Sequence, residues 1–260
     1  MTKPEEDRAA DESRREFLRW AAFAGAAIVA AGSTPFALEA IRGEETQGTP
    51  ERTRRWTMLI DLRRCDGCKK CEVACRKEHN VPEGQNWLKV FTLTAASGTF
   101  FLPRPCMHCE NPPCVKVCPV NATFRTADGL VLIDEGRCIG CRYCMAACPY
   151  DVRVFNWQTP DPPEPPQALS PDPVHGHLEH RRGVVEKCMF CAHRLKAGRL
   201  PACVEGCPML AIYFGDANED FVSNGYERLR LSTVLSSQQT FRYKEELGTE
   251  PRVYYLPVRR

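Results

Sequence analysis

Residues 138–149 read CIGCRYCMAACP, in which four cysteines follow the spacing C-x2-C-x2-C-x3-C. The same spacing occurs earlier, in CDGCKKCEVAC at residues 65–75. Gaps of two residues keep three thiols on one tight loop that faces a common point. A gap of three places the fourth thiol one helical turn further on, where its side chain points away from that point. Because the unit repeats, the sequence indicates a chain built from duplicated loops.

All sixteen cysteines fall into four groups of four, which we number as quartets 1 to 4 in chain order. The members are Cys65, Cys68, Cys71 and Cys75 in quartet 1; Cys106, Cys109, Cys114 and Cys118 in quartet 2; Cys138, Cys141, Cys144 and Cys148 in quartet 3; and Cys188, Cys191, Cys203 and Cys207 in quartet 4. Quartet 2 is spaced C-x2-C-x4-C-x3-C and quartet 4 is spaced C-x2-C-x11-C-x3-C. A proline follows quartets 2, 3 and 4, whereas Arg76 follows quartet 1.

Iron–sulfur clusters are the cofactor that this spacing favours. C-x2-C-x2-C-x3-C followed by proline is typical of bacterial ferredoxins, in which the fourth cysteine binds the other cluster of a pair. Structural zinc uses two C-x2-4-C pairs separated by a longer loop, a description that fits quartet 4 alone. Disulfides are the second alternative, but C-x-x-C pairs rarely staple a chain of this length. The sequence therefore predicts four [4Fe–4S] clusters with the sixteen cysteines as iron ligands.

The composition excludes several classes of protein. Of the 260 residues, 43% are hydrophobic and 26% charged, which is enough for a folded core and argues against a disordered chain. The formal net charge of +2 gives no electrostatic reason to expect nucleic-acid binding. No uninterrupted apolar run reaches the roughly 18 residues typical of a membrane span. We therefore expect neither a nucleic-acid partner nor a transmembrane span in this chain.

Residues 1–40 predict an export signal. SRREFLR at residues 13–19 precedes an alanine-rich apolar stretch at residues 20–31 and a small-residue exit, which are the three parts of such a segment. The paired arginines resemble the twin-arginine signal, with Arg19 in place of its usual lysine. The apolar stretch is shorter than the roughly 20 residues of a membrane anchor, and Ala37 and Ala40 are both candidates for a cleavage site. We expect a periplasmic protein, or one on the outer face of the cytoplasmic membrane, that takes up its cofactors before export.

The segments around the quartets carry a resemblance to a known family. They read RPCMHCENPPCVKVCPV, DGLVLIDEGRCIGCRYCMAACPY, EKCMFCAHRL, LPACVEGCP and EELGTEPRVYYLP. Together with the order of the quartets, they resemble the iron–sulfur subunits of the dimethyl sulfoxide, polysulfide and tetrathionate reductase type, which belong to the complex iron–sulfur molybdoenzymes. The resemblance covers about residues 55–257 and extends to the ferredoxin-like subunits of nitrite-reductase and sulfite-reduction complexes.

The resemblance implies a nested pairing of the quartets into four cluster sites. Site I takes Cys65, Cys68, Cys71 and Cys207; site II takes Cys188, Cys191, Cys203 and Cys75; site III takes Cys106, Cys109, Cys114 and Cys148; site IV takes Cys138, Cys141, Cys144 and Cys118. Sites I and II would then form one two-cluster ferredoxin module, into which a second module with sites III and IV is inserted.

This pairing gives an α+β fold of two nested ferredoxin-like modules with short strands, short helices and long loops. The outer module takes residues 55–100 and 187–215, and the inner module takes residues 101–157. The remaining segments are the signal at 1–40, a linker at 41–54, a proline-rich insertion at 158–186 and a C-terminal tail at 216–260. Apolar runs predict strands at residues 55–61, 87–91 and 130–134.

No catalytic constellation stands out among the other residues. His79, His108 and His193 lie beside cysteine motifs, and we expect His108 to donate a hydrogen bond near a cluster. His175, His177 and His180 follow the prolines and are expected in a solvated loop. Tyr143, Tyr150, Phe155 and Trp157 are expected to pack around the inner module. Because every thiol is already assigned, none is spare for nucleophilic chemistry.

Six basic residues surround quartet 1: Arg63, Arg64, Lys69, Lys70, Arg76 and Lys77. Positive charge near a cluster favours its reduced form, which predicts a cluster of relatively high potential in the outer module. Solvated surface charge, or a docking patch for an acidic partner, accounts for the same residues equally well.

The sequence therefore predicts an electron-transfer subunit with no catalytic site of its own. The resemblance implies that it relays electrons between an integral membrane subunit that reacts with quinone or quinol and a catalytic subunit that contains molybdopterin. The alternative is a subunit of a molybdenum-free membrane redox complex, such as the sulfite-reduction type. Neither the terminal substrate nor the direction of electron flow follows from these residues.

Overall fold

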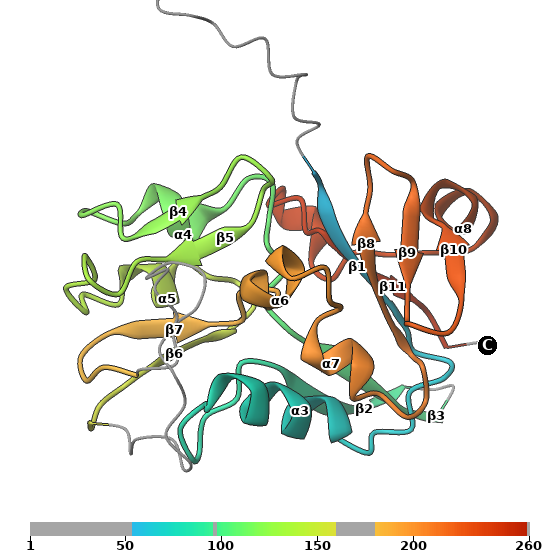
Figure 1. Ribbon diagram of the computed structural model, residues 1–260, viewed down its shortest axis with the longest axis horizontal. Helices are drawn as coiled ribbons and strands as arrows, with labels where there is room; N and C mark the ends of the chain where they lie inside the picture. Colours follow the sequence, from blue (N-terminus) through green and yellow to red (C-terminus); the bar gives the residue numbers. More distant parts are fainter. Residues whose placement is uncertain (1–53, 96–97, 160–179, 259–260) are drawn as a thin grey trace, which may run out of the picture. The chain divides into compact units, whose positions relative to one another are not determined.

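The computed structural model describes residues 54–95, 98–159 and 180–258 (Figure 1). The predicted export signal, nearly all of the linker, and residues 160–179 of the proline-rich insertion, with His175 and His177, lie outside these ranges. Short helices and short strands alternate along the described residues, which confirms the predicted α+β class. Within those ranges, no helix combines the length and hydropathy that crossing a membrane requires.

The helices carry the later cysteines of each quartet. The helices are α3 (Lys70–His79), α4 (Pro113–Lys116), α5 (Tyr143–Ala146), α6 (Ala192–Lys196), α7 (Ala202–Glu205), α8 (Leu231–Ser237) and the 3-10 turn η1 (Glu245–Leu247). Four of them, α3, α4, α5 and α7, contain the third cysteine of a quartet. The fourth cysteine lies four residues on, about one helical turn later. Cys75 is still within α3, whereas Cys118, Cys148 and Cys207 lie just beyond the ends of α4, α5 and α7.

The strands are β1 (Trp56–Asp61), β2 (Lys89–Ala95), β3 (Gly98–Arg104), β4 (Thr123–Arg125), β5 (Val131–Ile133), β6 (Arg153–Phe155), β7 (Val185–Lys187), β8 (Ile212–Asp216), β9 (Phe221–Ser223), β10 (Arg228–Arg230) and β11 (Val253–Leu256). Strand β1 matches the prediction for residues 55–61, and β5 matches that for residues 130–134. Strand β2 begins two residues later than the predicted start at Trp87.

Four antiparallel strand pairs connect the quartets in a cycle. Strand β2 follows quartet 1 and pairs with β3, which precedes quartet 2; β4 and β5 join quartets 2 and 3 in the same way. Strand β6 follows quartet 3 and pairs with β7, which precedes quartet 4, and β8 follows quartet 4 and pairs with β1, which precedes quartet 1. Each ribbon therefore fixes the end of one cysteine loop against the beginning of the next. Because β8 returns to β1, the first and last quartets are brought together.

The largest sheet has the strand order β10-β9-β8-β1-β11 and presents two different faces (Figure 1). Successive side chains of a strand point to opposite faces. On β1, Met58 and Ile60 pack in the core that contains cysteines of quartets 1, 2 and 4. Leu59, between them, packs with Leu231 and Val234 of α8 on the other face. The sheet therefore separates the cysteine-containing core from a smaller core that α8 covers.

The C-terminal residues complete this sheet and reach the inner module. Strand β11 runs parallel to β1, and β9 and β10 extend the sheet beyond β8. Just before β11, the Arg252 side chain donates to a carboxylate oxygen of Glu110 and to the Asp128 carbonyl oxygen. The backbone N–H of Glu110 in turn donates to the carbonyl oxygen of Glu250. The predicted tail is therefore integrated into the fold and connects the large sheet to the inner module.

Candidate metal centres

Two hollows of the inner module are each lined by four cysteines. One, with an open volume of about 310 Å³, contains Cys106, Cys109, Cys114 and Cys148 among its lining residues. The other, of similar volume, is lined by Cys118, Cys138, Cys141 and Cys144 with neighbouring backbone. In each hollow, three thiols come from one quartet and the fourth from the other. These are the sets that the nested pairing assigns to sites III and IV.

In the outer module, thiols of two different quartets act on one another electrostatically at site I. Burial raises the pKa of Cys71 to about 12, and repulsion from the Cys207 and Cys65 thiolates adds to the rise. The pKa of Cys65 is raised by burial, with Cys207 again adding to it. Cys207 of quartet 4 therefore lies beside the thiols of quartet 1.

The fourth cysteine of quartet 1 makes the reciprocal approach at site II. Burial raises the pKa of Cys75 well above its ordinary value, and repulsion from the Cys188 and Cys191 thiolates adds to the rise. For Cys203, burial is again the largest cause of a raised pKa, followed by Cys191 and Cys75. The structure thus groups the sixteen cysteines as sites I to IV require, while iron ligation by each residue stays a prediction.

The loops that open the four quartets share one backbone feature. The residue before the second cysteine adopts a positive φ in each loop: Gly67, His108, Gly140 and Phe190. At Gly140 a Cβ atom would stand 2.2 Å from the carbonyl oxygen of Gly183, so only glycine fits there. His108 and Phe190 adopt this conformation as well. Histidine is one of the residues enriched at positive φ, whereas a side chain as bulky as phenylalanine rarely adopts it. In quartets 2 and 3 the first two thiols of these loops line the hollows of sites III and IV.

The arrangement of the thiols fits a cluster better than a single ion. All sixteen cysteines are described and all have free thiols. In the described part of the chain, no three His, Cys, Asp or Glu side chains converge closely enough to bind one metal ion. A tetrahedral zinc site would need four sulfurs at about 2.3 Å from one point. In a [4Fe–4S] cluster each thiolate binds a different iron, so thiols that surround a hollow are the geometry required.

The four sites follow one another in a row. Burial raises the pKa of Cys188 in site II to about 11, and the next largest cause is Cys106 of site III. Cys71 of site I is among the neighbours that raise the pKa of Cys203 in site II. The thiols are buried or half-buried except for Cys68 of site I and Cys141 of site IV, which are exposed. The order is therefore I–II–III–IV, with solvent access at the two ends.

Two of the three histidines beside the motifs are buried and hydrogen-bonded. The backbone N–H of Val131 donates to His108 Nδ1 at 3.0 Å, so Nε2 carries the proton and donates to the Cys188 carbonyl oxygen at 3.1 Å. The expected hydrogen bond of His108 is confirmed. His79 Nε2 lies 3.1 Å from Cys191 Sγ, and burial lowers the pKa of His79 to about 3.

The other two described histidines pair with carboxylates. His193 Nε2 lies 2.8 Å from Glu78. His180 was expected in a solvated loop, but its side chain is buried between Glu186, at 2.8 Å, and the His79 carbonyl oxygen, at 2.8 Å. This expectation was wrong because His180 adjoins β7 and packs with it against the outer module.

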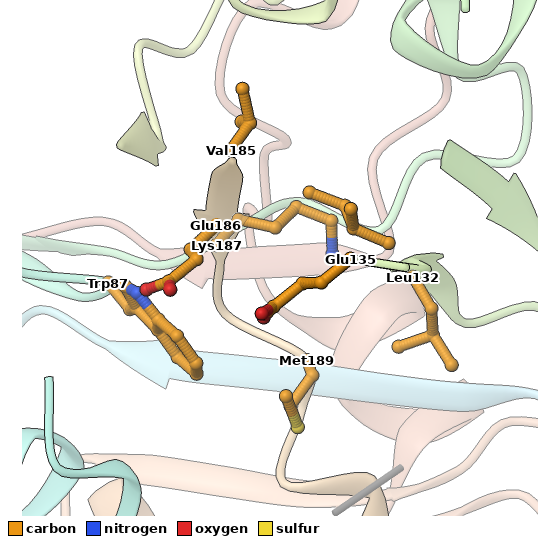
Figure 2. Close-up of a pocket in the computed structure, with 8 residues that line it drawn as sticks. Trp87, Leu132, Glu135, Val185, Glu186, Lys187 and Met189 are labelled. Carbon is orange, nitrogen blue, oxygen red and sulfur yellow. The ribbon is translucent and has the colours of Figure 1, made fainter. Parts of the chain in front are cut away.

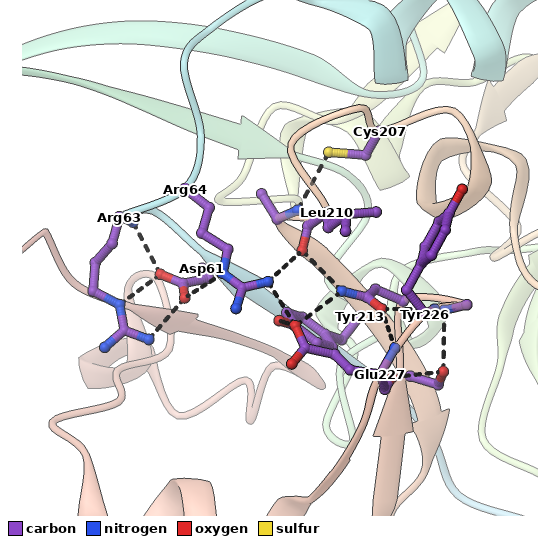
Figure 3. Close-up of polar contacts among 12 residues, drawn as sticks. Asp61, Arg63, Arg64, Cys207, Leu210, Tyr213, Tyr226 and Glu227 are labelled. Atoms are coloured by element: carbon purple, nitrogen blue, oxygen red, sulfur yellow. Dashed lines mark hydrogen bonds and ion pairs between the residues drawn. The ribbon is translucent and has the colours of Figure 1, made fainter.

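The basic residues around quartet 1 are exposed, and two of them are paired with carboxylates (Figure 3). Arg63 makes a bidentate ion pair with Asp61, at 2.7 Å for both nitrogens. Arg64 donates to Glu227 at 2.6 Å, and Tyr213 donates to the same carboxylate. Exposed charges are screened by water and salt. The geometry favours solvated surface charge over a tuning role at this position.

The buried cations lie elsewhere, at positions that the sequence did not reveal. Arg153 and Lys187 are each only 4% exposed, although nothing in their local sequence distinguishes them from surface residues. The only signal was their position, because both flank a cysteine motif within short apolar segments. Lys187 lines a hollow together with Glu135, Glu186, Trp87 and Met189 (Figure 2).

The aromatic residues of the inner module divide into two groups. Tyr150 is buried at 2% exposure, as expected, whereas Tyr143 and Trp157 are each 65% exposed. The expectation of packing was wrong for these two. The Arg142 guanidinium covers the Trp157 ring at 4.5 Å from its centroid, and Trp157 packs edge-on against Phe155 on the outside of the module. Tyr143, Trp157 and Ile139, which is 63% exposed, form a surface patch beside the exposed Cys141.

Known proteins match this chain over its cysteine motifs. Two family models, each described as a 4Fe-4S dicluster domain, match residues 97–161 with 174–217, and residues 64–122. A selenate reductase subunit of Mesobacillus selenatarsenatis is 43% identical over 218 residues, covering 78% of this chain and 72% of the relative. A tetrathionate reductase subunit of Salmonella typhimurium is 39% identical over 256 residues, covering 95% and 88%. The iron-sulfur cluster-binding subunit of the menaquinone reductase of Nitratidesulfovibrio vulgaris is 42% identical over 239 residues, covering 79% and 89%.

Proposed function

Because the chain belongs to the family of 4Fe–4S dicluster iron–sulfur subunits of the dimethyl sulfoxide and tetrathionate reductase type, we propose that it connects a quinone-reactive membrane subunit to a molybdopterin-containing catalytic subunit. The chain is an electron-transfer subunit of an oxidoreductase complex and is not the catalytic subunit. It carries four [4Fe–4S] clusters. When bound, these clusters supply one-electron transfer, and the protein determines their spacing, environment and access.

The sixteen cysteines bind the clusters in the nested scheme of sites I to IV. The single observation that carries this proposal is that thiols from two quartets, three from one and one from its partner, line each of the two hollows of the inner module. In the outer module Cys207 acts on the thiols of quartet 1, and Cys188 and Cys191 act on Cys75. Burial raises the pKa of most of these thiols, so they are protonated before loading. Cluster binding therefore releases protons and stabilises the fold, as it does at other metal sites.

The surrounding residues exclude water and donate hydrogen bonds to sulfur. Backbone N–H groups of Thr123 and Ala211 lie 3.4 Å from Cys118 Sγ and Cys207 Sγ, the fourth cysteines of sites IV and I. At Cys118, where burial opposes the effect, backbone N–H groups near Thr123 lower the pKa below its ordinary value. Hydrogen bonds to the sulfurs and exclusion of solvent are the means by which a protein sets cluster potentials.

The two ends of the row serve as the points of electron entry and exit. Cys68 at site I and Cys141 at site IV are the exposed thiols. Around Cys68 lie exposed lysines, Lys69 and Lys70, and around Cys141 lies the patch of Ile139, Tyr143 and Trp157. These different surfaces suit two different partner subunits. Sites II and III, whose thiols are largely buried, connect the ends.

Residues 1–40 direct the folded, cofactor-loaded chain through the twin-arginine route. The support is the SRREFLR stretch and the short apolar segment that follows it. The chain then works in the periplasm or on the outer face of the cytoplasmic membrane, where it attaches through its partners. Replacing both Arg14 and Arg15 by lysine should leave the full-length chain in the cytoplasmic fraction, whereas a reporter exported normally with these substitutions would contradict the assignment.

A second candidate is a membrane redox complex without molybdenum. The observation in its favour is the menaquinone reductase relative, whose name refers to a quinone and to no terminal sulfur or selenium substrate. Purifying the native complex with its membrane partner distinguishes the two candidates. The main proposal expects molybdenum, about sixteen irons per chain for four clusters, and electron exchange of the clusters with a quinol or quinone analogue. Sixteen irons without molybdenum would favour the second candidate. Clusters that are neither reduced by the quinol nor oxidised by the quinone analogue would contradict both.

A further inference from the structure

Two buried cations stand directly opposite each other on the β6–β7 ribbon. Arg153 pairs with Lys187 in the register of these antiparallel strands, and each residue is only 4% exposed. Like charges directly opposite one another destabilise a strand pair. Burying an unpaired charge is costly as well. A chain that keeps both cations in this position needs negative charge close to them.

No carboxylate in the described residues supplies that charge. One Nη atom of Arg153 donates to Thr123 Oγ1 at 3.2 Å, and the other is buried without any hydrogen-bond partner. The Lys187 ammonium donates to two backbone carbonyl oxygens, those of Val131 and Cys188. Neither cation makes an ion pair within the part of the chain that the structure describes.

The two nearby acids do not fill this role. Glu186 lines part of the same hollow as Lys187, but its carboxylate accepts a hydrogen bond from Asn156 and pairs with His180, and it makes no ion pair with Lys187 in the described residues. Glu135 lines the same hollow as Lys187 (Figure 2). Burial, with repulsion from Glu186, raises the pKa of Glu135 to about 8, which favours the neutral form of this carboxyl group, and its Oε2 atom is buried without a hydrogen-bond partner in the described residues.

The cysteine thiols are the groups that face the two cations. Arg153 lines the hollow of site III together with its four cysteines. The Lys187 ammonium donates to the carbonyl oxygen of Val131, a residue that lines the same hollow. It also donates to the carbonyl oxygen of Cys188 in site II. The charges of Arg153 and Lys187 both oppose the rise in the pKa of Cys114 that burial causes. Site III is therefore the centre on which both charges act.

We propose that Arg153 and Lys187 are the buried counter-charges of site III and raise the reduction potential of the cluster bound there. The inference rests on the proposed function, since it assigns a role toward a cluster. A reduced cluster carries one more negative charge than an oxidised one. A fixed cation in a low-dielectric interior stabilises the more negative form, and much more strongly than a cation in water would. Both residues are positioning residues, because they act through electrostatics and not by binding iron.

The test is a dithionite titration of the purified complex, followed by electron paramagnetic resonance, in Arg153→Met and Lys187→Met variants. The signal of site III is identified as the one that Cys114→Ser removes or alters. We expect each variant to lower the equilibrium constant for reduction at site III by at least tenfold, which corresponds to a fall of about 59 mV for one electron. Site I, at the far end of the row, should keep its potential. Arg153→Lys keeps the charge and should retain most of the original potential.

Lys116→Gln provides the matched control. Lys116 lies two residues from Cys114, but its side chain is exposed, so solvent screens its charge and the shift should be small. Unchanged potentials in both methionine variants at full iron content would overturn the proposal, as would an equal fall at all four sites or in Lys116→Gln. If Arg153→Met does not retain its iron, Lys187→Met decides by the same criterion. The titration needs neither quinol nor molybdenum, so its outcome is independent of the experiment on the proposed function.

Discussion

The imidazole of His108 stacks on the ring of Phe190, with centroids 3.8 Å apart and an angle of 23° between the planes. The two residues occupy the same position in the loops of quartets 2 and 4, and both have a positive φ. Because quartet 2 belongs to the inner module and quartet 4 to the outer one, the stack joins the modules. It lies where Cys106 of site III comes close to Cys188 of site II.

Replacing His108 by alanine should destabilise this junction. The Val131 N–H would lose its buried partner, at a cost of about 1–3 kcal/mol, and the Cys188 carbonyl oxygen would keep only its hydrogen bond from Lys187. We expect a lower apparent Tm and a larger fraction of chain without full iron content. His193→Ala is the control, because His193 is partly exposed and water can replace its contact with Glu78. Equal effects of the two substitutions would argue against a structural role for the stack.

The nested scheme makes a specific prediction for Cys207→Ser. If Cys207 completes site I, the variant should alter the same resonance signal as Cys68→Ser. If quartet 4 instead binds one cluster locally, the variant should match Cys191→Ser. Spectra of the three variants, recorded at the same reduction level, distinguish the two schemes. The grouping of Cys207 with Cys65 and Cys71 leads us to expect the first result.

Gly140→Ala should be more harmful than Gly84→Ala, although both glycines have a positive φ, 68° and 79°. At Gly84 a Cβ meets nothing within 4 Å, so the substitution costs only the backbone strain of about 1–2 kcal/mol. At Gly140 the Cβ would also collide with the Gly183 carbonyl oxygen, at 2.2 Å. The loop that holds Cys138 and Cys141 must then shift. We expect loss of the site IV signal in Gly140→Ala alone, and equal spectra in both variants would contradict the steric argument.

Glu135→Gln should change how stability depends on pH. Burial raises the pKa of Glu135 from 4.5 to about 8. Between these values the folded chain binds a proton that the unfolded chain has released, so this group lowers stability progressively as pH rises through the window. Glutamine does not titrate, so the gain in apparent Tm of the variant over the original chain should be small near pH 4.5 and largest at about pH 8. A constant difference across that range would show that the carboxyl group is ionised in the fold.

Several features followed from the sequence without the structure. The spacing C-x2-C-x2-C-x3-C is a local property, since the direction of each thiol depends on the turns within a few neighbouring residues, and it predicted the loops and the helix that follows each. The strands at β1 and β5 followed from short apolar runs beside those loops. The resemblance supplied the grouping of Cys75 with Cys188 and of Cys148 with Cys106, and the structure brings these thiols together.

The electrostatic environment did not follow from the sequence. The six basic residues near quartet 1 are close to its cysteines along the chain, yet Arg63 and Arg64 are paired with Asp61 and Glu227 and exposed to solvent. Arg153 and Lys187 are far apart in the chain, and only the pairing of β6 with β7 places them opposite each other. The side chain of His180 likewise contacts the His79 carbonyl oxygen, which belongs to a segment remote in the chain.

The sequence by itself determined which atoms can bind the clusters, because cysteine spacing and loop conformation act over a few residues. Only the tertiary structure decided which charges act on those clusters. The interaction energy between a charge and a cluster depends on how far the charge lies from water and from opposite charge. Both distances are set by strand pairing and by packing between segments remote in the chain. The number and spacing of the thiols follow from the sequence, whereas Arg153 and Lys187 are brought together only by the pairing of β6 with β7.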